Sequence, residues 1–321
     1  ERTSAWPASR WGPTFSALSS ARYLIGGWSH EGDVSKTWVL RIREADVEWS
    51  EVTSSRCPPG RAFHTATVLE DGKRLALMGG LGDGGSRKDL WYFYEDTESW
   101  QRVSSQGQSQ GPSCAGHSAV SIDQQLILFG GVEREAAPIR LFTEDRFSRL
   151  ISIFDVRKED WLQNHGIRDG PMPRRNSACV RFGRHMIISG GVDDSSSHLA
   201  DTWVFDASQR VWRELLSSGT PVLKGHSAIA SGFDMYSFGG MKGPGQYASA
   251  KMSINSLSFG LRSDTVHVES AGYSPSRDSR DYSSDSDSSE DDNIVELPNG
   301  QLVPMRILRA FIQARNLDPE A

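Results

Sequence analysis

The sequence Leu75-Ala-Leu-Met78-Gly79-Gly80 decides the fold, because a short apolar run followed by two glycines recurs along the chain. The pairs that follow such a run are Gly26-Gly27, Gly79-Gly80, Gly130-Gly131, Gly190-Gly191 and Gly239-Gly240. Their first members are spaced by 53, 51, 60 and 49 residues. A near-constant period of this length indicates an array of structural repeats.

Other landmarks keep phase with the glycine pairs. A His or its substitute precedes each pair by 13 to 15 residues, at Pro13, His64, His117, Ser177 and His226. An Arg or its substitute comes three residues earlier, at Arg10, Arg61, Cys114, Arg174 and Leu223. A Trp closes four of the units, at Trp49, Trp100, Trp161 and Trp212, and the fifth unit has Val266 there.

Each unit contains four strand signals separated by turn residues. In the second unit they cover His64–Leu69, Leu75–Met78, Leu90–Tyr94 and Ser99–Val103. A lone four-stranded sheet leaves both faces uncovered, so radial stacking into a β-propeller is the expected solution. Glycine tolerates the close backbone approach expected between blades. We expect the closing Trp residues to fill the space between the sheets.

The pattern Pro-x-x-Arg-x-x-His, then Gly-Gly, then a later Trp resembles the kelch family. It is most similar to the long-repeat kind found in host cell factor and Rab effectors, over roughly residues 5–268. The resemblance implies an all-β kelch-type propeller in residues 1–273. Units one and four lack the His, and units three and five lack the Arg. We expect a ring of five or six blades, with a sixth supplied from before residue 1 or from residues 294–317.

The C-terminal part of the sequence has a different composition. Residues 274–293 contain eight Ser and seven acidic residues, which predicts a disordered, solvated linker. Its run from Ser283 to Asp292 resembles acidophilic kinase sites, so phosphorylation is a further expectation. Residues 294–321 read as a hairpin around Asn299-Gly300 and a short amphipathic helix over residues 304–316. That helix is expected to dock on its own propeller or in a partner's groove.

The bulk composition excludes several classes of protein. The net charge of −6 over 321 residues argues against nucleic-acid binding through a broad basic face. The sequence contains no apolar run of about 18 residues, so no membrane span is predicted. Three scattered cysteines, Cys57, Cys114 and Cys179, indicate reduced thiols and a cytoplasmic or nuclear protein. Residue 1 is Glu, so we expect upstream sequence to be missing.

The sequence shows no catalytic or cofactor motif. There is no Walker loop, no Gly-x-Ser-x-Gly and no His-Glu-x-x-His, so we expect no enzyme, no cofactor and no metal. His64, His117 and His226 fall at equivalent positions. They are expected to hydrogen-bond within their own blades, the alternative being a shared metal near the channel.

Loops on a rigid scaffold are where binding usually occurs. The loop at residues 132–149 is the longest of its kind and combines Arg with Phe, the composition of an interface hot spot. We therefore expect an acidic or phosphorylated protein or peptide to bind the following residues: Arg61, Arg134, Arg140, Phe142, Arg146, Phe147, Arg174 and Arg175. The alternative for Arg61 and Arg174 is pairing with carboxylates of their own blades.

The favoured function is a non-catalytic scaffold or adaptor that binds proteins through the loop face of the propeller. A second reading is the substrate-recognition subunit of a ubiquitin ligase whose adaptor domain lies outside this chain. A third is an enzyme with a metal site carried by the propeller. The composition of the loops supports the first reading, because it offers interface residues and no catalytic set.

Overall fold

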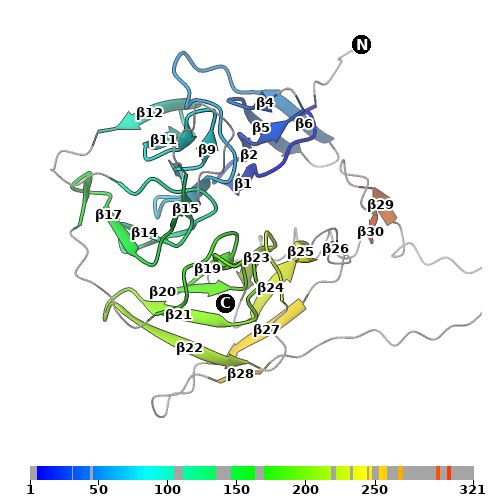
Figure 1. Ribbon diagram of the computed structural model, residues 1–321. Helices are drawn as coiled ribbons and strands as arrows, with labels where there is room; N and C mark the ends of the chain where they lie inside the picture. The colour runs from blue at the N-terminus through cyan, green and yellow to red at the C-terminus, as the bar shows by residue number, and fades with distance from the viewer. Residues whose placement is uncertain are drawn as a thin grey trace, which may run out of the picture. The chain divides into compact units, whose positions relative to one another are not determined.

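The computed structural model describes residues 6–30, 32–43, 46–104, 111–134, 146–162, 170–217, 222–231, 234–243, 246–247, 253–258, 267–269, 294–296 and 302–304. The chain divides into two compact units, Glu1–Gly272 and Tyr273–Ala321. All regular elements among these residues are β-strands. The first unit contains five four-stranded groups of strands, which we call blades one to five in chain order (Figure 1).

Blades one to three are separate antiparallel sheets. Blade one consists of β1 (Thr14–Ala17), β2 (Arg22–Ile25), β5 (Thr37–Arg43) and β6 (Asp46–Glu51). Blade two consists of β7 (Thr65–Val68), β8 (Arg74–Met78), β11 (Leu90–Tyr94) and β12 (Ser99–Val103). Blade three consists of β13 (Ser118–Ile122), β14 (Gln125–Phe129), β17 (Ile151–Asp155) and β18 (Asp160–Trp161). The four strands expected in the second repeat are confirmed to within a residue or two at their ends.

Blades four and five join through their last strands. Blade four consists of β19 (Ala178–Phe182), β20 (His185–Ser189), β21 (Thr202–Asp206) and β22 (Val211–Ser217). Blade five consists of β23 (Ser227–Ser231), β24 (Asp234–Phe238), β27 (Ser253–Ser258) and β28 (His267–Glu269). Strand β28 also pairs in parallel with β22. The first strands β1, β7, β13, β19 and β23 pack one after another, so they form the inner side of the array.

Alternation along each strand makes both faces of a blade apolar. In β8, Leu75 and Leu77 belong to the core shared with blade one. The intervening Ala76 and Met78 belong to the core shared with blade three. All four side chains are fully buried. Because successive side chains of a strand point to opposite faces, one strand contributes to two inter-blade cores. Burial of a Leu stabilises by about 1.5–3 kcal/mol, so these layers hold the blades together.

The closing Trp residues occupy the space between blades, as predicted. Trp100, Trp161 and Trp212 are buried and lie in the cores that their blades share with the preceding one. Each packs against a Phe of its own blade, with ring centroids 4.9–5.2 Å apart. Trp49 of blade one is half-buried and contacts Phe15. Trp100, Trp161 and Trp212 are therefore structural rather than part of a binding surface.

Two carboxylates of blade two each hold the turn between the first and second strands of a neighbouring blade. Glu95 of blade two accepts hydrogen bonds from Ser19 Oγ at 2.6 Å, Ser20 N at 3.0 Å and Ala21 N at 3.2 Å in blade one. Glu70 of blade two accepts from the backbone N–H groups of Asp123 at 2.7 Å and Gln124 at 3.0 Å in blade three. We call these contacts the carboxylate clamps.

The second unit contains one described element, an antiparallel hairpin. Strand β29 (Ile294–Glu296) pairs with β30 (Leu302–Pro304), with Val295 opposite Val303. The hairpin expected around Asn299-Gly300 therefore has its strands in place. The expected helix over residues 304–316 and the acidic segment 274–293 lie outside the described residues. A ring of five or six blades stays a prediction.

Candidate functional site

A series of backbone hydrogen bonds runs along the inner ends of the blades, just before each first strand. Phe63 N donates to Gly12 O at 2.8 Å, and Gly116 N donates to Phe63 O at 2.7 Å. Asn176 N donates to Gly116 O at 2.8 Å, and Gly225 N donates to Asn176 O at 2.7 Å. All five residues have positive φ, which Gly and Asn tolerate and Phe does not. Phe63, with φ 57°, is therefore a strained position at the inner rim of the first unit.

The glycine pairs bring each blade close to the next. Gly80 N donates to Cys114 O of blade three at 2.8 Å. A Cβ on Gly79 would lie 2.4 Å from that same oxygen, and the φ of Gly79 is 65°. Both the conformation and the contact therefore require glycine, as the sequence pattern predicted. The second glycines of the pairs at Gly27, Gly131 and Gly191 make the same donation to the next blade.

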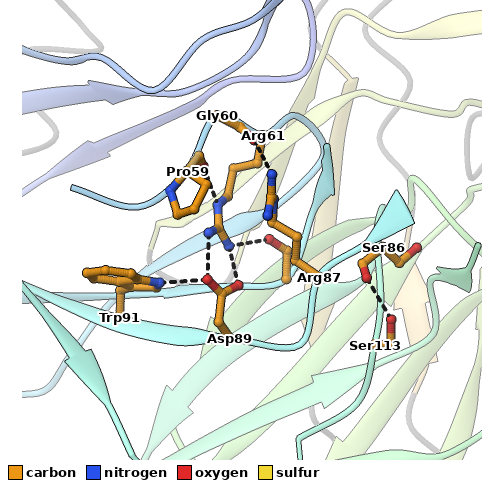
Figure 2. A network of polar contacts seen from close by, with 9 residues as sticks. Pro59, Gly60, Arg61, Ser86, Arg87, Asp89, Trp91 and Ser113 are labelled. Atoms are coloured by element: carbon orange, nitrogen blue, oxygen red, sulfur yellow. Dashed lines mark hydrogen bonds and ion pairs between the residues drawn. The ribbon is translucent and has the colours of Figure 1, made fainter. Parts of the chain in front are cut away.

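Arg61 is the centre of a polar network inside blade two (Figure 2). Its Nη1 and Nη2 donate to the two carboxylate oxygens of Asp89 at 2.7 and 2.8 Å. Its Nη1 also donates to Gly79 O at 2.9 Å, and its Nε donates to Pro59 O at 3.1 Å. Trp91 Nε1 donates to Asp89 at 2.7 Å. Burial alone would raise the pKa of Asp89, but Arg61 and Trp91 outweigh it and lower that pKa.

Blade four repeats this network with Arg174, Asp201 and Trp203. Arg174 Nη1 and Nη2 donate to Asp201 at 2.6 and 2.7 Å, and Trp203 Nε1 donates to it at 2.8 Å. Arg61 and Arg174 are each about 1% exposed. This corrects the expectation that both guanidinium groups face a partner at the channel mouth. Their pairing with carboxylates of their own blades, the alternative reading, is what the structure contains.

Blade three lacks both members of the ion pair. Cys114 takes the place of the Arg, and the exposed Leu150 takes the place of the Asp. The cysteines Cys57, Cys114 and Cys179 are free thiols. Burial raises the pKa of the Cys114 and Cys179 thiols, which disfavours the thiolate form of both.

Two of the three equivalent histidines, His64 and His117, bond between blades rather than within their own. His64 Nε2 lies 2.9 Å from Thr14 Oγ1 of blade one, and His117 Nε2 lies 2.9 Å from Thr65 Oγ1 of blade two. Both pairs are hydrogen-bonded, which corrects the expectation of bonds within each blade. Among the described residues no group of three or more His, Cys, Asp or Glu side chains could hold a metal ion.

Each blade carries a one-residue bridge between the segment before its first strand and the loop after its second strand. The bridges are Trp11–Trp28, Ala62–Leu81, Ala115–Val132, Arg175–Val192 and Lys224–Met241. The two sets of loops therefore meet at one end of every blade, as a shared loop face requires. The composition of the bridges differs between blades: aromatic in blade one, and basic in blades four and five.

Three aromatic side chains gather in the first part of this face. Trp11 and Trp28 exchange two backbone hydrogen bonds of 2.7 Å, and their side chains are 64% and 50% exposed. Phe63 packs edge-on against Trp11 with ring centroids 5.1 Å apart. The sequence prediction missed all three. Aligning the five units would have found them, because Trp11 and Phe63 stand where other units have Ala, Arg or Lys and Gly or Asn.

The long loop of blade three contributes the basic and aromatic residues that the sequence predicted. Strand β15 (Val132–Glu133) pairs with β16 (Arg146–Phe147), so the described ends of the loop form a small hairpin. The guanidinium of Arg175 lies over the Phe147 ring, 5.7 Å from its centroid. The backbone N–H of Arg134 donates to Ser86 Oγ of blade two at 2.9 Å. Arg140 and Phe142 lie outside the described residues.

These features define a class of protein: a β-propeller whose blades contact one another at Gly-Gly pairs and two of whose blades contain a buried Arg–Asp–Trp network. The family model for the KLHDC2/KLHL20/DRC7 kelch-repeats domain matches residues 12–240, more than half of the chain. The chain therefore belongs to the kelch-repeat family. A kelch propeller of this kind is in general a protein-interaction domain, and the family is generally non-catalytic.

The chain is similar to several longer kelch proteins. It is 27% identical over 246 residues to putative adagio-like protein 2 of Oryza sativa subsp. japonica, covering 70% of this chain and 38% of that protein. It is 29% identical over 237 residues to the F-box/kelch-repeat protein At1g51550 of Arabidopsis thaliana, covering 65% of this chain and 44% of that protein. The chain spans less than half the length of these relatives.

A solved structure agrees on the fold. The structure of YjhT matches with a TM-score of 0.61 at 17% identity, covering 77% of this chain and 82% of that one. At this identity the likeness supports the propeller architecture alone. Among the described residues no helix has the length and apolar character needed to span a membrane.

Proposed function

We propose that this protein is a non-catalytic scaffold or adaptor that binds a protein partner on the loop face. We define the rim surface as Trp11, Trp28, Phe63, Phe147, Arg175 and Lys224. The observation that carries the proposal is the pair of exposed indoles at Trp11 and Trp28 on a backbone fixed by two 2.7 Å hydrogen bonds. Rigid Trp and Arg side chains are the residues that most often dominate binding energy.

The charge of the rim surface suggests the chemistry of the partner. Arg175 and Lys224 lie at the bridge positions of blades four and five, and Arg146 is exposed in the long loop. Basic groups beside aromatic faces suit an acidic or phosphorylated peptide that also has apolar side chains. The strained Phe63 supports the same location, because backbone strain is retained where function needs it. The cytoplasm or nucleus, indicated by the sparse cysteines, stays a prediction.

Affinity purification of the full chain followed by mass spectrometry tests the proposal. The wild type is compared with Trp28→Ala, Arg175→Glu and a control, Lys158→Glu, whose charged side chain is exposed on the β17–β18 turn. If the proposal is right, some partners of the wild type are lost from both rim variants and retained by the control. Identical partner sets from all four proteins, at equal folded amounts, would exclude the rim surface.

A second candidate is the substrate-recognition subunit of a ubiquitin ligase. It is favoured by the relative that is named as an F-box/kelch-repeat protein. The same purification separates the two roles: ligase subunits that co-purify with the full-length protein support the receptor, and their absence from a set of rim-dependent partners supports the scaffold.

A further inference from the structure

Blade one contains two of the three members of the Arg–Asp–Trp network. Arg10 occupies the position of Arg61 and Arg174, and it holds the same backbone contacts. Its Nε donates to Ala8 O at 3.0 Å and its Nη1 to Gly26 O at 3.1 Å. The matching bonds of Arg174 are 3.1 Å to Met172 O and 3.1 Å to Gly190 O. The guanidinium of Arg10 therefore has the same orientation in its blade as those of Arg61 and Arg174 in theirs.

Trp38 is the counterpart of Trp91 and Trp203. It lies on β5 opposite Leu24, as Trp91 lies on β11 opposite Leu77. The Trp38 side chain is only 5% exposed, and its buried Nε1 has no hydrogen-bond partner among the described residues. In the complete networks this N–H donates to the carboxylate. An indole N–H buried without an acceptor is unfavourable, so its retention needs an explanation.

The missing member is the carboxylate. Lys36 takes the place of Asp89 and Asp201, as the backbone shows: Gly26 N donates to Lys36 O at 3.2 Å, and Gly190 N donates to Asp201 O at 3.1 Å. The Lys36 ammonium contacts Glu51 at 2.9 Å. Glu51 therefore has a partner of its own, although its charge also acts on Arg10. Arg10 and Trp38 are left as donors with the acceptor removed.

We propose that Arg10 and Trp38 form a binding site for the carboxylate of a ligand. The two complete networks show the geometry: one oxygen accepts from Nη1 of the Arg, and the other accepts from Nη2 and from the indole N–H. Arg10 is half-buried, whereas Arg61 and Arg174 are fully enclosed, so a ligand can reach it from solvent. A guanidinium fork selects planar two-oxygen anions over chloride.

The experiment follows the indole N–H signals of the full chain by ¹H–¹⁵N NMR during titration with acetate, at constant ionic strength kept with chloride. The Trp38→Phe variant assigns the Trp38 signal. The proposal expects that signal to shift with acetate and not with chloride, and Arg10→Gln to weaken the response roughly tenfold or more. N-acetyl-aspartyl amide is titrated in parallel. A tighter response to it points to a partner's acidic side chain, and an equal response points to small carboxylates.

Two variants at position 36 make the test specific. Lys36→Asp places a carboxylate of the chain itself in the site, so it should abolish the acetate response and raise the urea midpoint. Lys36→Asn removes the same contact with Glu51 without supplying a charge, so it should keep the response.

Three results would overturn the proposal: a Trp38 signal that acetate does not move, a response that survives in Lys36→Asp, or a response that appears only in Glu51→Gln. The last would mean that Glu51 fills the site in solution. None of these outcomes depends on whether the rim surface binds a partner, so the two proposals fail separately.

Discussion

His117 of blade three and Thr65 of blade two are hydrogen-bonded across the boundary between their blades, with Nε2 and Oγ1 2.9 Å apart. His64 and Thr14 make the same pair one boundary earlier. Ser177 and Ser118 replace it with two hydroxyls 2.9 Å apart. In blade four the position equivalent to Thr65 is Ala178, and at that boundary both ring nitrogens of His226 of blade five have no hydrogen-bond partner among the described residues.

The gap at position 178 gives the first prediction. Ala178→Thr should supply the missing hydroxyl and stabilise the protein relative to Ala178→Val by about 1 kcal/mol. Thr and Val have the same shape, so any strain from the added atoms cancels in the comparison. Urea unfolding measures both. The explanation fails if the Val variant is equally stable, or if adding His226→Phe leaves the difference between Thr and Val intact.

The buried histidines predict that acid destabilises the protein. Burial lowers the pKa of His117 and His226 to about 4, and burial with the nearby Arg61 charge lowers that of His64 to about 3. In the unfolded chain these groups have a pKa near 6.5. Between pH 6.5 and 4 the unfolded state therefore binds protons that the folded state does not, and stability falls as pH falls. Each group contributes up to about 1.4 kcal/mol per pH unit.

The measurement is the free energy of unfolding in urea at pH 7.5, 6.0 and 5.0. His117→Gln should show a shallower loss of stability than the wild type, because one proton no longer binds on unfolding. His30→Gln, at an exposed position, is the matched control and should leave the slope unchanged. Equal slopes for His117→Gln and the wild type would show that His117 does not contribute.

The glycine pairs predict a contrast between two chemically identical substitutions. Gly79 and Gly239 have φ of 65° and 73°, so Ala costs about 1–2 kcal/mol at either position. At Gly79 the new Cβ would also lie 2.4 Å from Cys114 O, whereas at Gly239 no described atom lies within 4 Å. Gly79→Ala should therefore be worse by roughly 1–3 kcal/mol, measured by thermal unfolding. Equal losses of stability in Gly79→Ala and Gly239→Ala would contradict the predicted clash with Cys114 O.

The buried ion pair predicts that one partner is harmful without the other. Asp89→Leu should cost about 3–5 kcal/mol, because it leaves the Arg61 charge buried. Adding Arg61→Leu removes that charge, so the double variant should be more stable than Asp89→Leu alone. The control is the same cycle at the exposed pair Lys36 and Glu51, where a coupling below about 1 kcal/mol is expected. The prediction is contradicted if the double variant loses as much stability as the two single variants together.

The sequence predicted the repeat and its physical causes well. The spacing of the glycine pairs, the four strands of the second unit and the place of Trp100, Trp161 and Trp212 all follow from local patterns, and the structure confirms them. Local patterns could not decide the side-chain partners of Arg61. Asp89 lies 28 residues away, just before β11, so the burial of Arg61 follows only from the pairing of β11 with β8.

The side-chain contacts of the loop face were predicted only in part, for a similar reason. A long loop with Arg and Phe is visible in one segment of sequence, and Phe147 does meet Arg175. Trp11 and Phe63 belong to different units, and their contact depends on the packing of neighbouring blades. Periodicity places such residues in phase, but only the stacking of blades makes them neighbours.

The carboxylate clamps have a consequence for how this propeller can change. Glu70 and Glu95 of blade two each bond to the turn between the first and second strands of a neighbouring blade, whereas the one-residue bridges lie before the first strands and after the second strands. The carboxylate clamps are thus separated from the loops that carry the rim surface, whereas the Gly-Gly contacts between blades lie beside those loops. Insertions or randomised sequences placed in the loops beyond the glycine pairs should leave the carboxylate clamps intact, which makes the chain a scaffold for engineered binding specificity.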